Sequence, residues 1–197
     1  MKIKLTALVC CCLLLFCLPA LAVVVNLSTR EIEEAIAFGT AHRGSIEKEL
    51  DARYAFGSKD EYAESGVVHT RWYKLAFMAA QKARQGGTLS AQEQEEIVTD
   101  PCLQVNIKVY GRSLDFARDY RVMLLQGGKT VAPEKIHADS FSADAAAKKT
   151  MPGFPGCWAI VRSYFSYAAF DPAAPVILVL KKDARESRFS IDLKSFK

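Results

Sequence analysis

The first half of the chain has its apolar residues at helical spacing, from residue 28 to about residue 100. The strongest pattern covers residues 70–85, where apolar side chains recur every three or four positions and two glycines follow. Helices are expected to begin at two capping boxes, Ser28 to Glu31 and Ser90 to Glu93, and to cover residues 45–54 and 70–85. The polar stretch 57–66 is expected to be a loop.

After Cys102 the apolar period changes from helical to two. The first strand is expected here, since four apolar residues alternate with amphipathic or polar ones: Leu103, Val105, Ile107 and Val109. Six strands are expected after residue 102, and Gly127-Gly128 is expected to turn a hairpin between two of them. Short strands separated by turn signals predict an antiparallel β-sandwich. An immunoglobulin-like arrangement is one form that such a sandwich takes.

These two patterns predict an α+β fold. The domain organisation expected is a helical segment over 23–101 and a β-sandwich over 102–197. Several strands look apolar on both sides, so the helices are expected to pack on or beside the sandwich. Residues 23–197 are therefore expected to form one compact unit, preceded by residues 1–22.

The first 22 residues have the composition of a secretory signal peptide. Two lysines precede an apolar run of about 14 residues, and Ala20-Leu21-Ala22 supplies the small residues that a signal peptidase requires. The run is short for a membrane-spanning helix, which needs roughly 20 residues. We expect cleavage after Ala22, a secreted or periplasmic product that begins at Val23, and no stable membrane anchor.

Charge argues against two classes of partner. The chain has 26 basic and 22 acidic residues, a net charge of +4. Removal of Lys2 and Lys4 with the signal leaves 24 basic residues against the same 22 acidic ones, a net charge of +2. That charge is too small to favour nucleic acid or an anionic membrane surface as a partner.

Two of the six cysteines, Cys102 and Cys157, remain after the signal is removed. Two thiols in one small exported domain most often pair, so a Cys102–Cys157 disulfide is predicted. The alternative is two buried free thiols. The chain has no Cys-x-x-Cys spacing that would indicate a redox-active pair.

No motif in the chain identifies a catalytic or cofactor site. His42, His69 and His137 lie in separate segments, without the spacing of a metal-binding helix. Gly-x-Ser-x-Gly and glycine-rich phosphate loops are missing from the sequence. We therefore expect no catalytic residue, no metal and no cofactor, with His69 the first candidate should a hydrolytic site exist.

The segment from Trp158 to Tyr167 is a strand with more aromatic residues than one buried face accommodates. Trp158, Arg162 and Tyr164 share one face of it, and these residue types are enriched at binding hot spots. They are the predicted binding residues. The alternative is that the helical segment covers this face.

These observations favour an exported, non-enzymatic protein with a binding or envelope-structural role. Its partner could be a protein that uses a face or an edge of the sheet. Two alternatives stay open: an extracytoplasmic hydrolase with a site assembled from scattered residues, and a subunit of a surface or secretion assembly whose sheet edge pairs with a partner strand.

Overall fold

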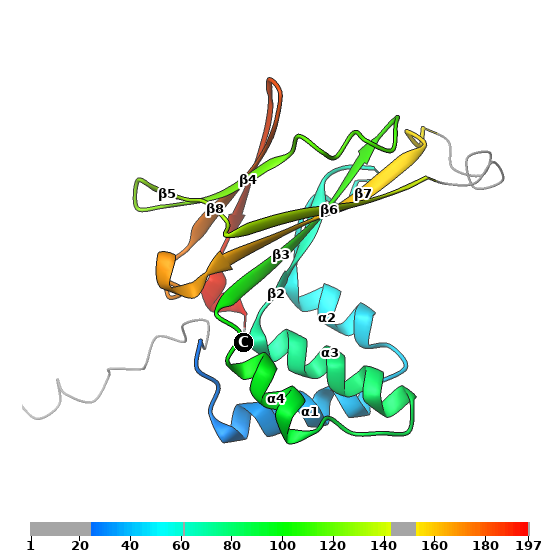
Figure 1. Cartoon of the computed structure of the whole chain (residues 1–197), viewed down its shortest axis with the longest axis vertical. Coiled ribbons are helices and arrows are strands. Elements are labelled where there is room, and N and C mark those ends of the chain that lie inside the picture. The colour runs from blue at the N-terminus through cyan, green and yellow to red at the C-terminus, as the bar shows by residue number, and fades with distance from the viewer. Residues whose placement is uncertain (1–24, 61, 143–152, 197) are drawn as a thin grey trace, which may run out of the picture.

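Four helices gather on one side of two antiparallel sheets in the computed structural model, which describes residues 25–60, 62–142 and 153–196 (Figure 1). They are α1 (Thr29–Ala41), α2 (Ile46–Tyr54), α3 (Arg71–Arg84) and α4 (Ala91–Val98). Both capping boxes form, because Ser28 and Ser90 each accept a hydrogen bond from the amide three residues ahead. The predicted α+β class and the predicted helices are confirmed.

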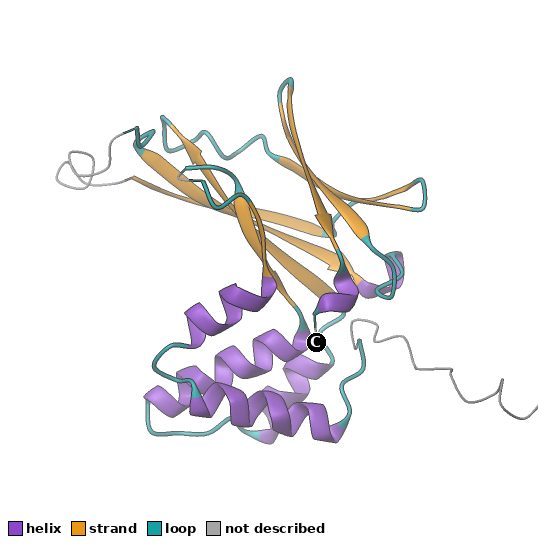
Figure 2. Cartoon of the chain, turned by 180° about the vertical axis from the view of Figure 1, so that it is seen from behind, coloured by secondary structure: helices purple, strands orange, loops and turns teal. Residues whose placement is uncertain are grey.

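The strands form one sheet of five and one of four, seen in orange in Figure 2. The first has the order β1 (Ala55–Gly57), β2 (Ser65–His69), β3 (Cys102–Gly111), β7 (Cys157–Ser166) and β6 (Lys135–Ser142). The second has the order β5 (Lys129–Val131), β4 (Arg121–Gln126), β8 (Val176–Lys182) and β9 (Arg185–Ile191). Neighbouring strands are antiparallel throughout. The sandwich and its immunoglobulin-like form stay predictions.

Three strands were not expected from the sequence. β1 and β2 lie inside the segment expected to be helical, and their ends fall within the predicted loop 57–66. β6 raises the number of described strands after residue 101 to seven, not six. None of the three has the strict apolar alternation of β3, because β1 and β6 are edge strands and β2 has only five residues. Their pairing with β3 or β7, not their own pattern, defines them.

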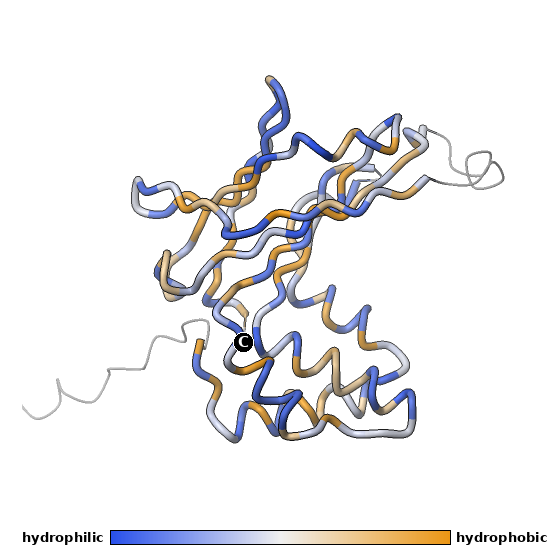
Figure 3. Tube along the Cα trace, viewed as in Figure 1, coloured by the Kyte–Doolittle hydropathy of each residue, from blue (hydrophilic) through white to orange (hydrophobic). Residues whose placement is uncertain are grey.

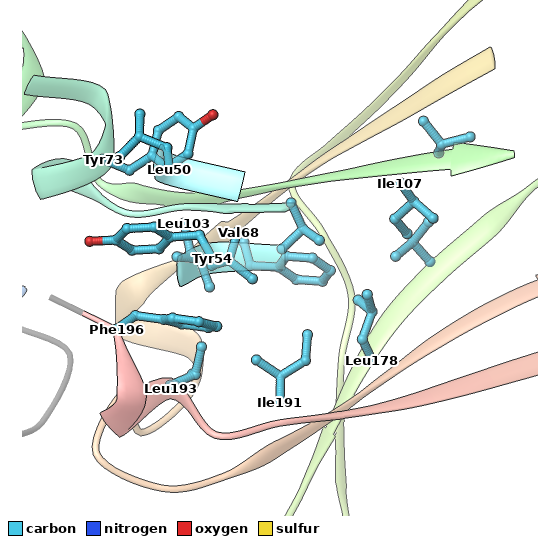
Figure 4. Packing of buried hydrophobic residues seen from close by; sticks show 14 of the residues in the cluster. Leu50, Tyr54, Val68, Tyr73, Leu103, Ile107, Leu178, Ile191, Leu193 and Phe196 are labelled. Carbon is cyan, nitrogen blue, oxygen red and sulfur yellow. The ribbon is translucent and has the colours of Figure 1, made fainter. Parts of the chain in front are cut away.

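The helices and both sheets contribute to one cluster of buried apolar side chains. In Figure 4, Ile107 of β3 and Leu178 of β8 point toward each other from the two sheets. Where the helices meet the sheets, the rings of Tyr54 and Phe196 stack with centroids 5.3 Å apart. Close packing also holds between α1 and α3, since a Cβ at Gly39 would overlap the backbone carbonyl of Ala76.

The predicted Cys102–Cys157 disulfide is wrong: both cysteines are free and buried. Cys102 pairs with Ser166 at one end of the β3–β7 ladder, and Cys157 pairs with Gly111 at the other end. Nine residue steps separate the two positions, about 30 Å at the rise of a strand, whereas a disulfide needs Cα atoms within about 7 Å. The alternative reading, two buried free thiols, is the one that the structure shows.

The Cys102 thiol is kept protonated by its surroundings. Its burial raises the pKa to about 11, and the Glu134 carboxylate, which accepts a hydrogen bond from Sγ at 3.4 Å, acts in the same direction. A protonated, buried thiol is a poor nucleophile.

No helix in the described part of the chain is long and apolar enough to cross a membrane. The predicted signal peptide, residues 1–22, lies outside the described residues. Its cleavage and the localisation that follows from it stay predictions.

Candidate functional site

β7 has one buried face and one half-exposed face. Its odd-numbered residues are buried, whereas Trp158, Arg162 and Tyr164 share the partly exposed side. The tube in Figure 3 shows the same change of hydrophilic and hydrophobic positions along the strands. The structure therefore places all three predicted binding residues on one face, here called the outer face, and the helices do not bury them. Their role in binding stays a prediction.

Trp158 is held between side chains of the two flanking strands. The ring of Phe141 on β6 stacks against it, with centroids 4.3 Å apart and planes at 22°. From β3, the Lys108 ammonium lies 5.3 Å from the Trp158 centroid and 5.3 Å from that of Tyr110. Neighbours on both sides leave little of the ring free to stack on a ligand, so Trp158 contributes mainly to the rigidity of this face.

Arg162 makes an ion pair on the outer face. Its Nη1 donates to Asp139 Oδ2, and Nε2 of His137 lies 2.7 Å from the other carboxylate oxygen. The three side chains come from adjacent strands, since His137 is directly opposite Arg162 in the β6–β7 register. Asp139 thus neutralises part of the positive charge and orients the guanidinium.

The register links the predicted binding residues to His69 and to two residues that sequence reasoning did not select, Gln104 and Asn106. Across β3, Arg162 is opposite Asn106 and Tyr164 is opposite Gln104, and His69 on β2 is opposite Gln104. The side chains of the latter three form a chain of hydrogen bonds. The amide nitrogen of Gln104 donates to Asn106 Oδ1 at 2.9 Å, and Asn106 Nδ2 lies 3.1 Å from His69 Nε2.

The imidazole of His69 is neutral at neutral pH. Burial lowers its pKa to about 4, and the positive charges of Lys74 and Arg162 act in the same direction. Because an amide nitrogen can only donate, Nε2 accepts from Asn106, and the single ring proton is on Nδ1. Nδ1 has no hydrogen-bond partner among the described residues and is available to a ligand.

Two pockets meet at His69. One, of about 400 Å³, lies between α2 and the β2–β3 part of the outer face and includes Asp51, Ser65, Asn106 and Lys108. The other, of about 350 Å³, lies along α3 and α4 and includes the apolar side chains of Phe77, Met78 and Ile97. His69 and Tyr73 line both, with their rings 4.1 Å apart.

The first pocket contains both signs of charge. Lys108 supplies an ammonium, and Asp51 on α2 supplies a carboxyl whose pKa is raised by burial and by the neighbouring Glu47. Tyr73, whose phenol pKa burial raises to about 12, stays a neutral hydrogen-bonding group. Donors and acceptors of this kind over an apolar floor are typical of sites that bind a small polar ligand.

The hydrogen bonding of His69 in the described residues differs from that of a catalytic histidine. In the described ranges, its hydrogen bond is to an amide and not to a carboxylate or hydroxyl, and its low pKa makes it a weak base. His42 lies at the end of α1 and His137 on β6, so the histidines are not brought together. The described residues also contain no group of three His, Cys, Asp or Glu side chains that could hold a metal ion.

Sequence reasoning placed Gln104 and Asn106 on the polar side of a strand but did not select them. The signal that could have found them is the same alternation that predicts β3, since its polar positions all face one way. The chain matches no protein-family model, no curated protein and no solved structure.

Proposed function

We propose that this protein is exported and that it binds a small polar ligand on the outer face of its five-stranded sheet, without catalysing a reaction. The observation that carries the proposal is the pair of adjoining pockets at His69, where a neutral imidazole fixed by Asn106 keeps its Nδ1–H free. The absence of a nucleophile or carboxylate bonded to His69 in the described residues favours binding over hydrolysis.

The proposal also includes the arrangement of the sheets and the localisation. We infer that the sheets are the two layers of a sandwich, since apolar side chains from both share one buried cluster. Such a rigid frame suits a preformed site. Localisation is secreted or periplasmic, with cleavage after Ala22; an intact mass that retains residues 1–22 would contradict it.

Thermal unfolding of the mature protein tests ligand binding. The probes are amino acids, mono- and disaccharides, small carboxylates and polyamines, each at millimolar concentration. A ligand that binds the folded state raises Tm, because it stabilises that state by mass action. The proposal expects at least one class of probe to do so.

Matched variants locate the site. Asn106→Leu keeps the approximate size of the side chain and removes both hydrogen bonds, so it should abolish the shift. Arg188→Ala on β9, which is exposed and lines neither pocket, should leave it unchanged. No shift with any probe, an equal shift in Asn106→Leu, or chemical turnover of the bound compound would each overturn the proposal.

A further inference from the structure

The two sheets have four edge strands, and three of them are short or protected. β5 has only three residues. β1 and β9 lie against each other, with the ring centroids of Phe56 and Phe189 5.3 Å apart. Glu64, which directly precedes β2, adds an ion pair to β9, with Oε1 3.1 Å from the guanidinium of Arg185. Mutual cover of this kind is one way in which proteins block pairing at an edge.

β6 is the long edge that remains open among the described strands. Its eight residues pair with β7 on one side only. Ile136 is 41% exposed and Phe141 is 42% exposed, which is unusual for large apolar side chains. An open strand of this length offers a row of backbone hydrogen-bonding groups to a further strand.

We propose that β6 pairs with β6 of a second copy of this chain, antiparallel and with Ala138 opposite Ala138, so that the two five-stranded sheets become one continuous sheet of ten. Antiparallel strands that continue a sheet must oppose residues of the same face. His137, Asp139 and Phe141 lie on the outer face, and Ile136, Ala138 and Ser140 on the inner one.

Cross-strand pairing favours this register, because an imidazole N–H can donate a hydrogen bond to a carboxylate. With Ala138 at the centre, His137 is opposite Asp139 of the second copy, twice by symmetry. Lys135 is then opposite Phe141 of the second copy, where an ammonium is favoured over a ring. A register centred on Asp139 would oppose two carboxylates, and one centred on His137 would place Pro133, which has no N–H, within the ladder.

The size of the contact predicts a weak dimer. Two eight-residue strands bury less than the roughly 1,600 Å² of a standard interface. Sedimentation velocity of the mature protein should therefore show a monomer that converts to a dimer as concentration rises into the high micromolar range. A monomer at every concentration overturns the proposal and assigns any β6 partner to another protein.

Cysteine cross-linking tests the register. In Ala138→Cys the two introduced side chains are directly opposite, about 5 Å apart at Cβ, so mild oxidation should give a covalent dimer. Ser140→Cys is the matched control on the same strand and face. Its two copies lie about 14 Å apart along the strands and should stay uncross-linked. Equal cross-linking of both variants, or of neither, contradicts the register.

A charge exchange provides a rescue test. Phe141→Lys places lysine opposite Lys135 of the second copy and should abolish the dimer. Lys135→Glu combined with Phe141→Lys should restore it, because glutamate and lysine then face each other. Ile177→Lys, which changes an exposed apolar residue on β8 of the other sheet, should leave the dimer intact. Failure of the double variant to dimerise, while it remains folded by circular dichroism, overturns the proposed pairing. The pocket at His69 is lined mainly by β2, β3 and the helices, and β7 lies between β3 and the β6 edge, so ligand binding and dimerisation are tested separately.

Discussion

The two faces of β7 share one backbone and the same flanking strands, yet they differ in burial and in the kind of side chain that they carry. The inner face is buried against the core, with Val161, Ser163 and Phe165 all fully inaccessible. Polar and aromatic side chains fill the outer face, where Arg162 and Tyr164 stand opposite the amides of β3. The difference shows that one side of the strand supplies the buried core, whereas the other keeps polar and aromatic side chains partly accessible.

The largest expected effect separates the two faces directly. Phe165→Ala removes a large buried ring and leaves a cavity, so it should lower the free energy of unfolding by about 3–5 kcal/mol. Tyr164→Ala, next to it on the outer face, should cost less than about 1 kcal/mol. Urea unfolding followed by circular dichroism measures both. Similar losses at the two positions would mean that the outer face is also part of the core.

The next effect depends on pH. The pKa of His69 is about 4 in the folded protein against 6.5 for an ordinary histidine. Between these values the unfolded chain takes up a proton that the folded chain does not, so stability should fall as the pH is lowered, by up to about 3 kcal/mol. His69→Gln should flatten the profile of stability against pH. Parallel profiles for wild type and His69→Gln would show that His69 titrates normally.

A smaller effect concerns Ser163, the hydroxyl-bearing residue on the buried face of β7. Ser163 is fully buried, and its hydroxyl has no hydrogen-bond partner in the described part of the structure. Ser163→Ala removes this unsatisfied group and should raise the free energy of unfolding by about 1 kcal/mol. Ser166→Ala on the outer face is the control and should change it little. A clear loss of stability in Ser163→Ala would indicate that the hydroxyl is hydrogen-bonded in solution.

The smallest effect on stability is expected at the outer ion pair. Arg162→Gln breaks the contact with Asp139 but leaves a half-exposed position, so it should cost less than about 1 kcal/mol, and less still in high salt. The same change removes one positive charge that lowers the pKa of His69. An NMR titration should therefore show that pKa move toward its ordinary value; an unchanged pKa would separate Arg162 from the pocket.

Local patterns predicted much of this fold. Capping boxes at Ser28 and Ser90 and the alternation of β3 depend on residues within a few positions of one another, so they can be recognised without knowledge of the rest of the chain. The outer-face position of Trp158, Arg162 and Tyr164 follows from the same alternation.

The features that the sequence did not predict depend on contacts between segments that are distant in the chain. β6 has no strong pattern of its own and exists because β7 supplies its hydrogen bonds. The disulfide was predicted from the number of cysteines, but the antiparallel register places Cys102 and Cys157 at opposite ends of one ladder. His69, Asn106 and Gln104 are also separated in sequence by a helix pair, and only the β2–β3 pairing joins them.

The sequence by itself thus determined the helices, the main strands and the face to which each β7 side chain belongs, because these depend on the period of apolar residues along a short segment. Only the tertiary structure decided strand order and register. Those two features separate the cysteines, assemble the pocket around His69 and leave β6 open at the edge. The physical reason is that a strand forms its hydrogen bonds with another segment, and its own residues do not specify which segment that is.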